Sequence, residues 1–197
     1  MLAKYSLLKS YQDRGVVLTK WPDKSEPDEI SFATFFRRPD RFRFDWTSHH
    51  PFPPLRHLKT QHVIWYDGTG AFHYMDGEDG GVEPQESLFM AVAGATGISK
   101  CSALTVFNML MPEMGARSFA ELRSLDLQQG VFEGSDCHCI RGQDSQGEEQ
   151  KLCIGNDYTL RCVSESFRAG RLSQEIRREI HVDEPIDDDV FQFRPGT

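Results

Sequence analysis

The sequence is short of positive charge: its 197 residues contain 22 Lys and Arg against 30 Asp and Glu, a net charge of −8 at pH 7. A protein that binds nucleic acid needs cations to replace the counterions of the phosphates, so this balance argues against a nucleic-acid partner. Disorder is also excluded, because 14 Phe, 5 Tyr and 3 Trp supply ample apolar surface. The length suits one globular domain over residues 1–197.

The familiar catalytic motifs are missing as well. The sequence has no Gly-x-Ser-x-Gly nucleophile turn, no His-Glu-x-x-His helix and no Gly-x-x-x-x-Gly-Lys phosphate loop. His49, His50, His57 and His62 gather around the proline-rich stretch 51–54, but no acidic cluster nearby in the sequence completes a site. We therefore predict neither enzymatic activity nor a cofactor.

No secretory signal is visible at the start of the sequence, which lacks a charged beginning followed by a long apolar stretch. The chain is therefore either cytosolic or begins after a removed signal. The most apolar region, residues 87–112, contains Lys100 and is interrupted by Gly94 and Gly97. Because a central lysine costs about 3 kcal/mol in a membrane-spanning helix, we predict two short buried helices and at most peripheral contact with a membrane.

Helical and strand-like periodicities alternate along the chain. Apolar residues recur at helical spacing over 2–13, and two very apolar helices are predicted at 84–93 and 99–111, the first opened by Pro84 and the second ended by Pro112. Strand-like runs occupy 15–20, 31–37, 41–46, 62–66, 70–75, 127–132, 136–141, 150–154, 159–164 and 175–182, with a last short strand or edge segment at 190–193.

One face of the predicted sheet is apolar. In the run 41–46, Phe42, Phe44 and Trp46 alternate with charged residues and so share a face. The predicted helix 99–111 is apolar nearly all round and must be covered by other elements. This order of elements predicts an α+β fold, with a strongly curved antiparallel sheet and helices against its apolar concave face.

A hydrophobic ligand site is predicted between this sheet and the helices. The methionines of the helices and the break at Gly94 and Gly97 give an adaptable composition that suits hydrophobic ligands. Ordinary core packing is the alternative for any single residue of the set. The residues expected to line the cavity are Phe42, Phe44, Trp46, Ile64, Phe72, Phe89, Met90, Leu104 and Phe107.

The cysteines resemble a metal site at first sight. On a strand, however, Cys137 and Cys139 point away from His138, and the spacings typical of zinc sites are absent, so no metal is predicted. A symmetric turn would place Cys139 opposite Cys153, with Cys162 on the same face and diagonal to Cys153. A Cys139–Cys153 disulfide is one possibility, and buried free thiols are the other.

Several segments resemble the LolA/LolB-like superfamily of lipoprotein carriers. In one of them, Arg38-Pro39 precedes an aromatic strand, as in the strand–turn–strand of the carriers. The segments similar to the carriers are 36–44, 62–68 and 190–195, and those that resemble an uncharacterised periplasmic branch of the same superfamily are 11–15 and 130–138.

The resemblance implies a half-open, mostly antiparallel β-barrel whose apolar cavity is closed by a helical lid, here the segment at about 84–112. It also implies a periplasmic or cell-envelope protein, its signal peptide removed, that binds lipoprotein acyl chains or lipid without catalysis or cofactor. In the carriers, the arginine before the motif proline bonds to the lid and helps to gate the cavity, a role that carries over to Arg38.

Two other classes of function stay open. An envelope sensor of the same fold would bind a protein partner, with the acidic segment 183–189 as its docking element. A secreted enzyme would rely on the unexplained histidine and cysteine clusters.

Overall fold

Residues 1–49, 53–55, 58–77, 80–114, 119–167 and 172–195 are described by the computed structural model. The strands are β1 (Ser10–Lys20), β2 (Asp28–Arg37), β3 (Arg41–His49), β4 (Lys59–Tyr66), β5 (Ala71–Met75), β6 (Gly81–Gln85), β7 (Arg123–Phe132), β8 (Ser135–Gln143), β9 (Glu149–Gly155), β10 (Leu160–Phe167) and β11 (Leu172–Val182). The helices are α1 (Leu2–Tyr5), α2 (Leu88–Ala95) and α3 (Ser102–Leu110), with short 3-10 turns η1 (Pro53–Leu55), η2 (Pro112–Met114), η3 (Phe119–Glu121) and η4 (Asp188–Phe191).

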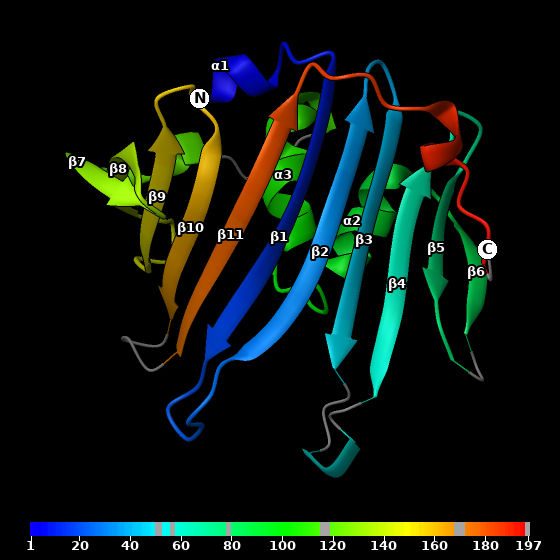
Figure 1. The fold of residues 1–197 in the computed structure, drawn as a ribbon, viewed down its shortest axis with the longest axis horizontal. Helices are drawn as coiled ribbons and strands as arrows, with labels where there is room; N and C mark the ends of the chain where they lie inside the picture. The colour runs from blue at the N-terminus through cyan, green and yellow to red at the C-terminus, as the bar shows by residue number, and fades with distance from the viewer. Residues whose placement is uncertain (50–52, 56–57, 78–79, 115–118, 168–171, 196–197) are drawn as a thin grey trace.

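The strands form one antiparallel sheet of eleven, in the order β6-β5-β4-β3-β2-β1-β11-β10-β9-β8-β7. The sheet curves around α2 and α3, which lie on its far side in Figure 1. It stays open, since β6 and β7 end the order and do not pair with each other within the described residues. The structure thus has the half-open, strongly curved antiparallel sheet with enclosed helices that the resemblance to the LolA/LolB-like carriers implies.

The core lies between the concave face of the sheet and the two apolar helices. Phe42 and Phe44 are completely buried, as the strict alternation of β3 predicts. Phe107 of α3 packs edge-on against Phe42, with ring centroids 5.4 Å apart. No helix in the described part of the chain is both long enough and apolar enough to cross a membrane.

The sheet consists of two meanders, β1–β6 and β7–β11, that are joined through β1 and β11. These two strands pair antiparallel from Tyr11↔Val182 to Lys20↔Ser173. Facing inward at this seam, Asp13 of β1 forms an ion pair with Arg178 of β11, and both side chains are inaccessible to solvent. Arg178 also donates to the carbonyl of Ser102, the first residue of α3, at 2.8 Å. The ion pair therefore links both meanders to the helices.

The predicted helix over 2–13 is wrong beyond Tyr5. The helix α1 covers only Leu2–Tyr5, and Ser10–Lys20 forms the central strand β1. The spacing of Leu2, Tyr5, Leu8 and Tyr11 fits a helix, but pairing with β2 and β11 on both sides outweighs this local pattern.

The predicted start of the first lid helix at Pro84 is also wrong. Pro84 lies in β6, opposite Phe72, where an edge strand tolerates the missing N–H. The helix α2 is opened instead by Ser87, whose hydroxyl accepts from the N–H of Met90 at 3.2 Å, and it continues through Gly94 to Ala95.

The strand or edge segment expected at 190–193 is instead a 3-10 turn, Asp188–Phe191, and the chain after it. Its aromatic side chains pack on the outer face of the sheet, where Phe193 contacts Trp65 and Tyr74 at centroid distances of 5.2 and 5.0 Å. The segment therefore crosses the sheet rather than extending it.

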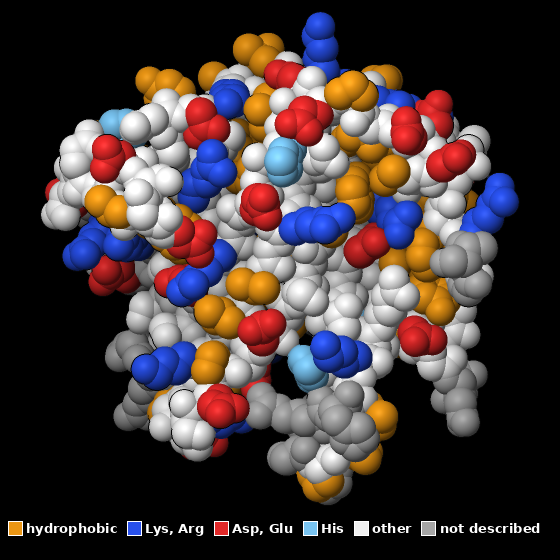
Figure 2. Space-filling view, viewed as in Figure 1, with side chains coloured by type: hydrophobic (Ala, Val, Ile, Leu, Met, Phe, Trp, Pro, Cys, Tyr) orange, Lys and Arg blue, Asp and Glu red, His pale blue; other side chains and the backbone are white. Residues whose placement is uncertain are grey.

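The acidic segment 183–189 is held against the sheet by hydrogen bonds to its backbone carbonyls. Ser10 donates to the carbonyl of Glu184 at 2.6 Å, Arg37 donates to the carbonyl of Ile186 at 2.9 Å, and the Ile186 side chain is buried. Figure 2 shows the outer face of the sheet, where acidic and basic side chains are mixed without one sign prevailing.

Candidate functional site

Five of the residues predicted to line a cavity are instead tightly packed in the hydrophobic core. Phe42, Phe44, Trp46, Ile64 and Phe107 each expose 1% of their surface or less. They belong to the same hydrophobic cluster as α2 and α3, so the helices fill the space in which the ligand was expected. Of the cavities described below, none is lined by these five residues.

The other four predicted lining residues do not come together at one site in the structure. Phe72 lies on the outer face, stacked on Trp65 with ring centroids 5.2 Å apart, because its position in β5 alternates away from the core. Met90 is 48% exposed on α2, and Phe89 is half-buried against the core cluster. Only Leu104 lines a cavity, a small one beside the groove described next.

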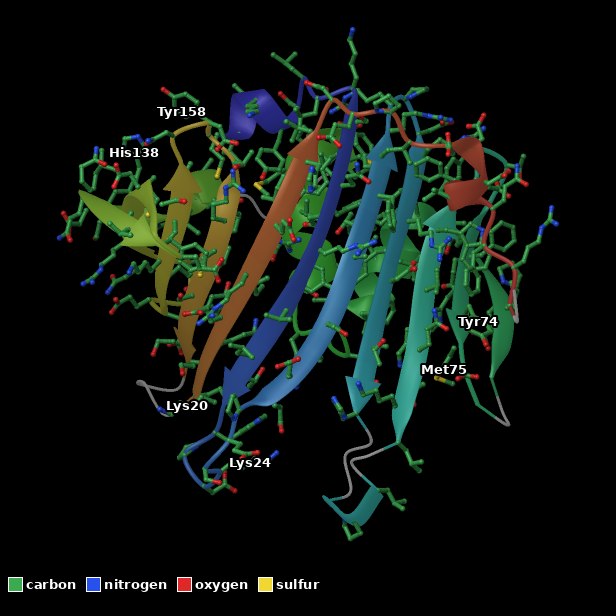
Figure 3. The ribbon with its side chains drawn as sticks, in the orientation of Figure 1. Lys20, Lys24, Tyr74, Met75, His138 and Tyr158 are labelled. Carbon is green, nitrogen blue, oxygen red and sulfur yellow. The ribbon has the colours of Figure 1, made fainter. Side chains whose placement is uncertain are left out.

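The structure places an apolar groove elsewhere, at the β7–β9 end of the sheet. It has a volume of about 510 Å³ and lies on the concave face, below α1 and η3. Figure 3 shows two of its residues, His138 and Tyr158, at this end of the sheet near α1. The residues that line it are Met1, Leu2, Phe119, Leu122, Leu125, Leu127, His138, Ile140, Leu152, Ile154 and Tyr158.

Strand register explains why these side chains meet. Leu127 of β7 lies opposite Ile140 of β8, which lies opposite Leu152 of β9, so one apolar row crosses three strands. His138 and Ile154 form the next row on the same face. The floor is therefore set by ordinary strand alternation.

The rim of the groove is apolar and open to solvent. Leu125, Leu127 and Tyr158 expose 62%, 67% and 58% of their surface, whereas Leu152 and Ile154 of the floor are buried. Soluble proteins seldom leave such contiguous apolar surface uncovered unless it binds something. The arrangement can receive an apolar chain without a rearrangement of the floor.

Two contacts hold α1 over the groove. The ammonium of Lys4 donates to the carbonyl of Asp157 at 2.6 Å, in the turn between β9 and β10. The hydroxyl of the buried Tyr5 accepts from the N–H of Leu160 at 3.0 Å. Met1 and Leu2, which line the groove, are thereby placed above its floor.

A smaller cavity of about 230 Å³, with a mixed polar and apolar lining, shares Phe119 and Leu122 with the groove. Its wall includes Glu165, whose carboxylate accepts from the amide of Gln150 at 3.1 Å. Burial, helped by the charge of Asp144, raises the pKa of Glu165 to about 7. The apolar groove thus adjoins a pocket whose carboxyl group is partly protonated at neutral pH.

Arg38 bonds to the end of α3, a contact of the kind that the resemblance to the carriers implies for the arginine before the motif proline. Its Nη2 donates to the carbonyl of Leu110, the last residue of α3, at 2.7 Å. Its Nε donates to the carbonyl of Leu8 at 2.9 Å, just beyond α1. The guanidinium of Arg38 therefore connects the end of α3 to the segment that follows α1, the helix that lies over the groove.

The cysteine register is confirmed in part. Cys139 lies opposite Cys153, as predicted, but Cys162 also lies opposite Cys153 rather than diagonal to it. A bulge in β10 shifts the pairing before Cys162 and explains the difference. The Sγ atoms of Cys139 and Cys153 are 3.9 Å apart and no bond joins them.

Of the four histidines near the proline-rich stretch, the two that the structure describes, His49 and His62, have different surroundings. His62 faces the core, stacked on Trp46 with centroids 4.7 Å apart and 5.9 Å from the ring of His73. His49 ends β3 and is exposed. His50 and His57 lie outside the described residues.

No protein-family model and no curated protein matches the chain. Among solved structures, LprF from Mycobacterium bovis superposes with a TM-score of 0.57 at 10% identity, covering 94% of this chain and 90% of that chain. A DUF1329 family protein from Desulfovibrio piger (TM-score 0.42, 10% identity, 96% and 92% covered) and a LolA superfamily protein from Nitrosomonas europaea (TM-score 0.38, 7% identity, 96% and 95% covered) are similar more loosely. The match to LprF shows a shared fold.

Proposed function

We propose that this chain is a non-enzymatic binding or carrier protein for a hydrophobic ligand, such as lipid or the acyl chains of a lipoprotein, and that the ligand occupies the groove at the β7–β9 end. The observation that carries the proposal is the open apolar groove of about 510 Å³, with Leu125 and Leu127 exposed at its rim. Ligand pockets in proteins are typically about 300–1,000 Å³ and mostly apolar.

The chemistry of the lining favours an alkyl chain over a polar ligand. His138 is the only histidine among the lining residues, and the others have aliphatic, aromatic or thioether side chains. Each methylene that moves from water into such a groove contributes about 0.8 kcal/mol, so the affinity should rise with the length of the alkyl chain. A head group would lie toward the polar side chains of the adjoining cavity, Gln150 and Glu165.

The cell envelope is the location that we infer for this function. A half-open sheet with enclosed helices is what the resemblance of residues 36–44, 62–68 and 190–195 to the LolA/LolB-like carriers implies, and the described residues have that architecture. Such carriers act in the periplasm, so envelope lipoproteins are the partners proposed for this chain, in a mature form whose signal peptide has been removed.

The groove is tested by placing a charge in it. Leu127→Asp is expected to weaken the binding of a fluorescent fatty-acid probe by at least about tenfold, because the bound chain would have to bury an unpaired carboxylate. Val131→Asp is the matched control, since Val131 is 68% exposed on the same strand but does not line the groove. Equal affinity of both variants for the probe, measured by fluorescence titration, would refute the groove as the binding site.

Arg38 is proposed to control access by holding α3 to the segment after α1. Arg38→Leu should lower the folding stability by about 1–3 kcal/mol, because the carbonyls of the buried residues Leu8 and Leu110 lose their charged hydrogen-bond donor. It should nevertheless change the rate of probe release, measured by stopped-flow displacement, by shifting the populations of open and closed forms.

Arg41→Leu is the control for this gate. Arg41 likewise donates to a backbone carbonyl, that of Asp67, but at the turn between β4 and β5 rather than at α3. If wild type and both variants release the probe at one rate, Arg38 has a structural role only.

A further inference from the structure

Four buried cysteines form a cluster on the outer face of the sheet, behind the groove. Cys137 and Cys139 come from β8, Cys153 from β9 and Cys162 from β10, and their exposed fractions are 1%, 9%, 5% and 2%. They alternate along their strands with groove residues, so the two sets occupy opposite faces. Phe132, at the end of β7, packs against the cluster.

Three of the sulfur atoms are spaced like the ligands of one ion. The Sγ atoms of Cys137 and Cys139 are 3.7 Å apart, and those of Cys139 and Cys153 are 3.9 Å apart. All three lie within 4.8 Å of one another. In a tetrahedral site with Zn–S bonds of about 2.3 Å, neighbouring sulfurs are about 3.8 Å apart.

The backbone closes directly over these sulfurs. A Cβ atom on Gly130 of β7 would lie 2.7 Å from the Sγ of Cys139 and 3.8 Å from that of Cys137. Gly130 lies opposite Cys137 in the ladder, so the backbone of β7, with no side chain at this position, lies next to the sulfur atoms. The absence of a side chain at this position leaves the sulfurs in place.

We propose that Cys137, Cys139 and Cys153 bind a thiolate-preferring cation, Zn²⁺ or Cu⁺, with Cys162 as the fourth ligand when the ion is Zn²⁺. Soft thiolates select these ions, and three of them suffice for Cu⁺ whereas Zn²⁺ takes four. Each thiol that binds the ion releases its proton to solvent. Cys162 faces Cys153 across the ladder, but its Sγ lies outside the group of three, so its side chain must move to become the fourth ligand.

The surrounding charges favour such a site. Lys151 lies close enough to interact electrostatically with Cys137 and Cys162, and Arg177 lies close enough to interact with Cys162. These cations would offset the excess negative charge of a metal–thiolate group.

The test uses the purified chain, reduced and stripped with a chelator, and then titrated with Co²⁺, Zn²⁺ and Cu⁺ in separate experiments. Co²⁺ is expected to give one equivalent of sulfur-to-metal charge-transfer absorption, which Zn²⁺ or Cu⁺ displaces. The competing ion that displaces Co²⁺ at stoichiometric concentration is the one that the site binds more tightly, and elemental analysis of the untreated protein identifies the native metal and its occupancy.

Cys153→Ser should weaken metal binding by at least about tenfold, since loss of a residue that merely supports a ligand already costs 10- to 100-fold. Cys101→Ser is the matched control, because Cys101 caps α3 outside the cluster. Circular dichroism and fatty-acid binding of both variants show whether the fold and the groove are intact. The metal site is therefore tested independently of the proposed function.

Two results would overturn the proposal. One is a folded, reduced protein that gives no charge-transfer absorption and in which Cys153→Ser and wild type bind metal alike, which leaves four packed thiols. The other is a Cys139–Cys153 disulfide in protein purified without reductant, together with failure to bind any of the three ions after reduction.

Discussion

Asp13→Leu is expected to lower the free energy of unfolding by about 3–5 kcal/mol, because it leaves the guanidinium of Arg178 charged in the core without its carboxylate. Both side chains of this pair are inaccessible to solvent. The hydroxyl of Tyr11 also loses its acceptor, the Oδ2 of Asp13 at 2.6 Å. Urea denaturation of the purified variant measures the loss.

A double variant separates the pair from the packing around it. Asp13→Leu with Arg178→Met should be more stable than either single variant, since two apolar side chains leave no buried charge. Arg161→Met is the control, because the ion pair of Arg161 with Asp157 is largely exposed and should contribute under about 1 kcal/mol. If the two single losses simply add, the charges of Asp13 and Arg178 are not coupled.

The stability that His62 contributes should be lost as the pH falls from 6.5 to about 4, whereas Glu165, whose pKa burial raises to about 7, contributes in the opposite direction as the pH falls below 7. Burial, with the nearby His73, lowers the pKa of His62 from 6.5 to about 4, and burial also lowers the pKa of His73. Within this range the imidazole of His62 is protonated in the unfolded chain but not in the folded chain, so its contribution to stability is complete above pH 6.5 and is lost as the pH falls. The loss for His62 alone is about 2–3 kcal/mol by pH 4.

The histidine stack is the physical cause of this behaviour. The rings of His62 and His73 lie parallel to that of Trp46, at interplanar angles of 7° and 6°. Among the described residues, His62 Nδ1 and His73 Nε2 are buried and have no hydrogen-bond partner that could stabilise an added proton.

His62→Phe should keep the stacked ring and gain about 1–2 kcal/mol of stability relative to wild type on going from pH 7 to pH 5, as measured by urea denaturation at both pH values. His181→Gln is the control, since His181 is half exposed on the outer face. The same change in stability between these pH values in His62→Phe and in wild type would assign the pH dependence to other groups.

Strand alternation accounts for what the sequence could predict. Phe42, Phe44 and Trp46 alternate with charged residues, and their strand and inward face are confirmed. β1 was harder to predict because its inward positions include the charged Asp13, which only its pairing with Arg178 makes acceptable in the core. That partner lies 165 residues away, beyond any local pattern.

The groove could not be located from the sequence for a related reason. Leu125 and Leu127 alternate with polar residues as any core-facing strand does, so the pattern predicts an apolar face but not what covers it. In the structure α2 and α3 fill the space over the middle strands, and the β7–β9 end is left open. Several residues that were expected to bind the ligand therefore lie in the hydrophobic core. The groove is lined instead by residues whose sequence pattern is that of an ordinary core-facing strand.

The seam between β1 and β11 has a consequence for how the chain acquires its fold. Each meander contains mostly hairpins of neighbouring strands, which close short loops, but the seam joins Tyr11 to Val182 across nearly the whole chain. Such a distant pairing carries a large loop-closure entropy and belongs with the slow, millisecond-to-second class of folding reactions. During synthesis β1 remains with one edge unpaired until β11, the last strand, has been made. Over that interval the nascent chain is exposed to strand-to-strand aggregation, and a holding chaperone would have most effect there.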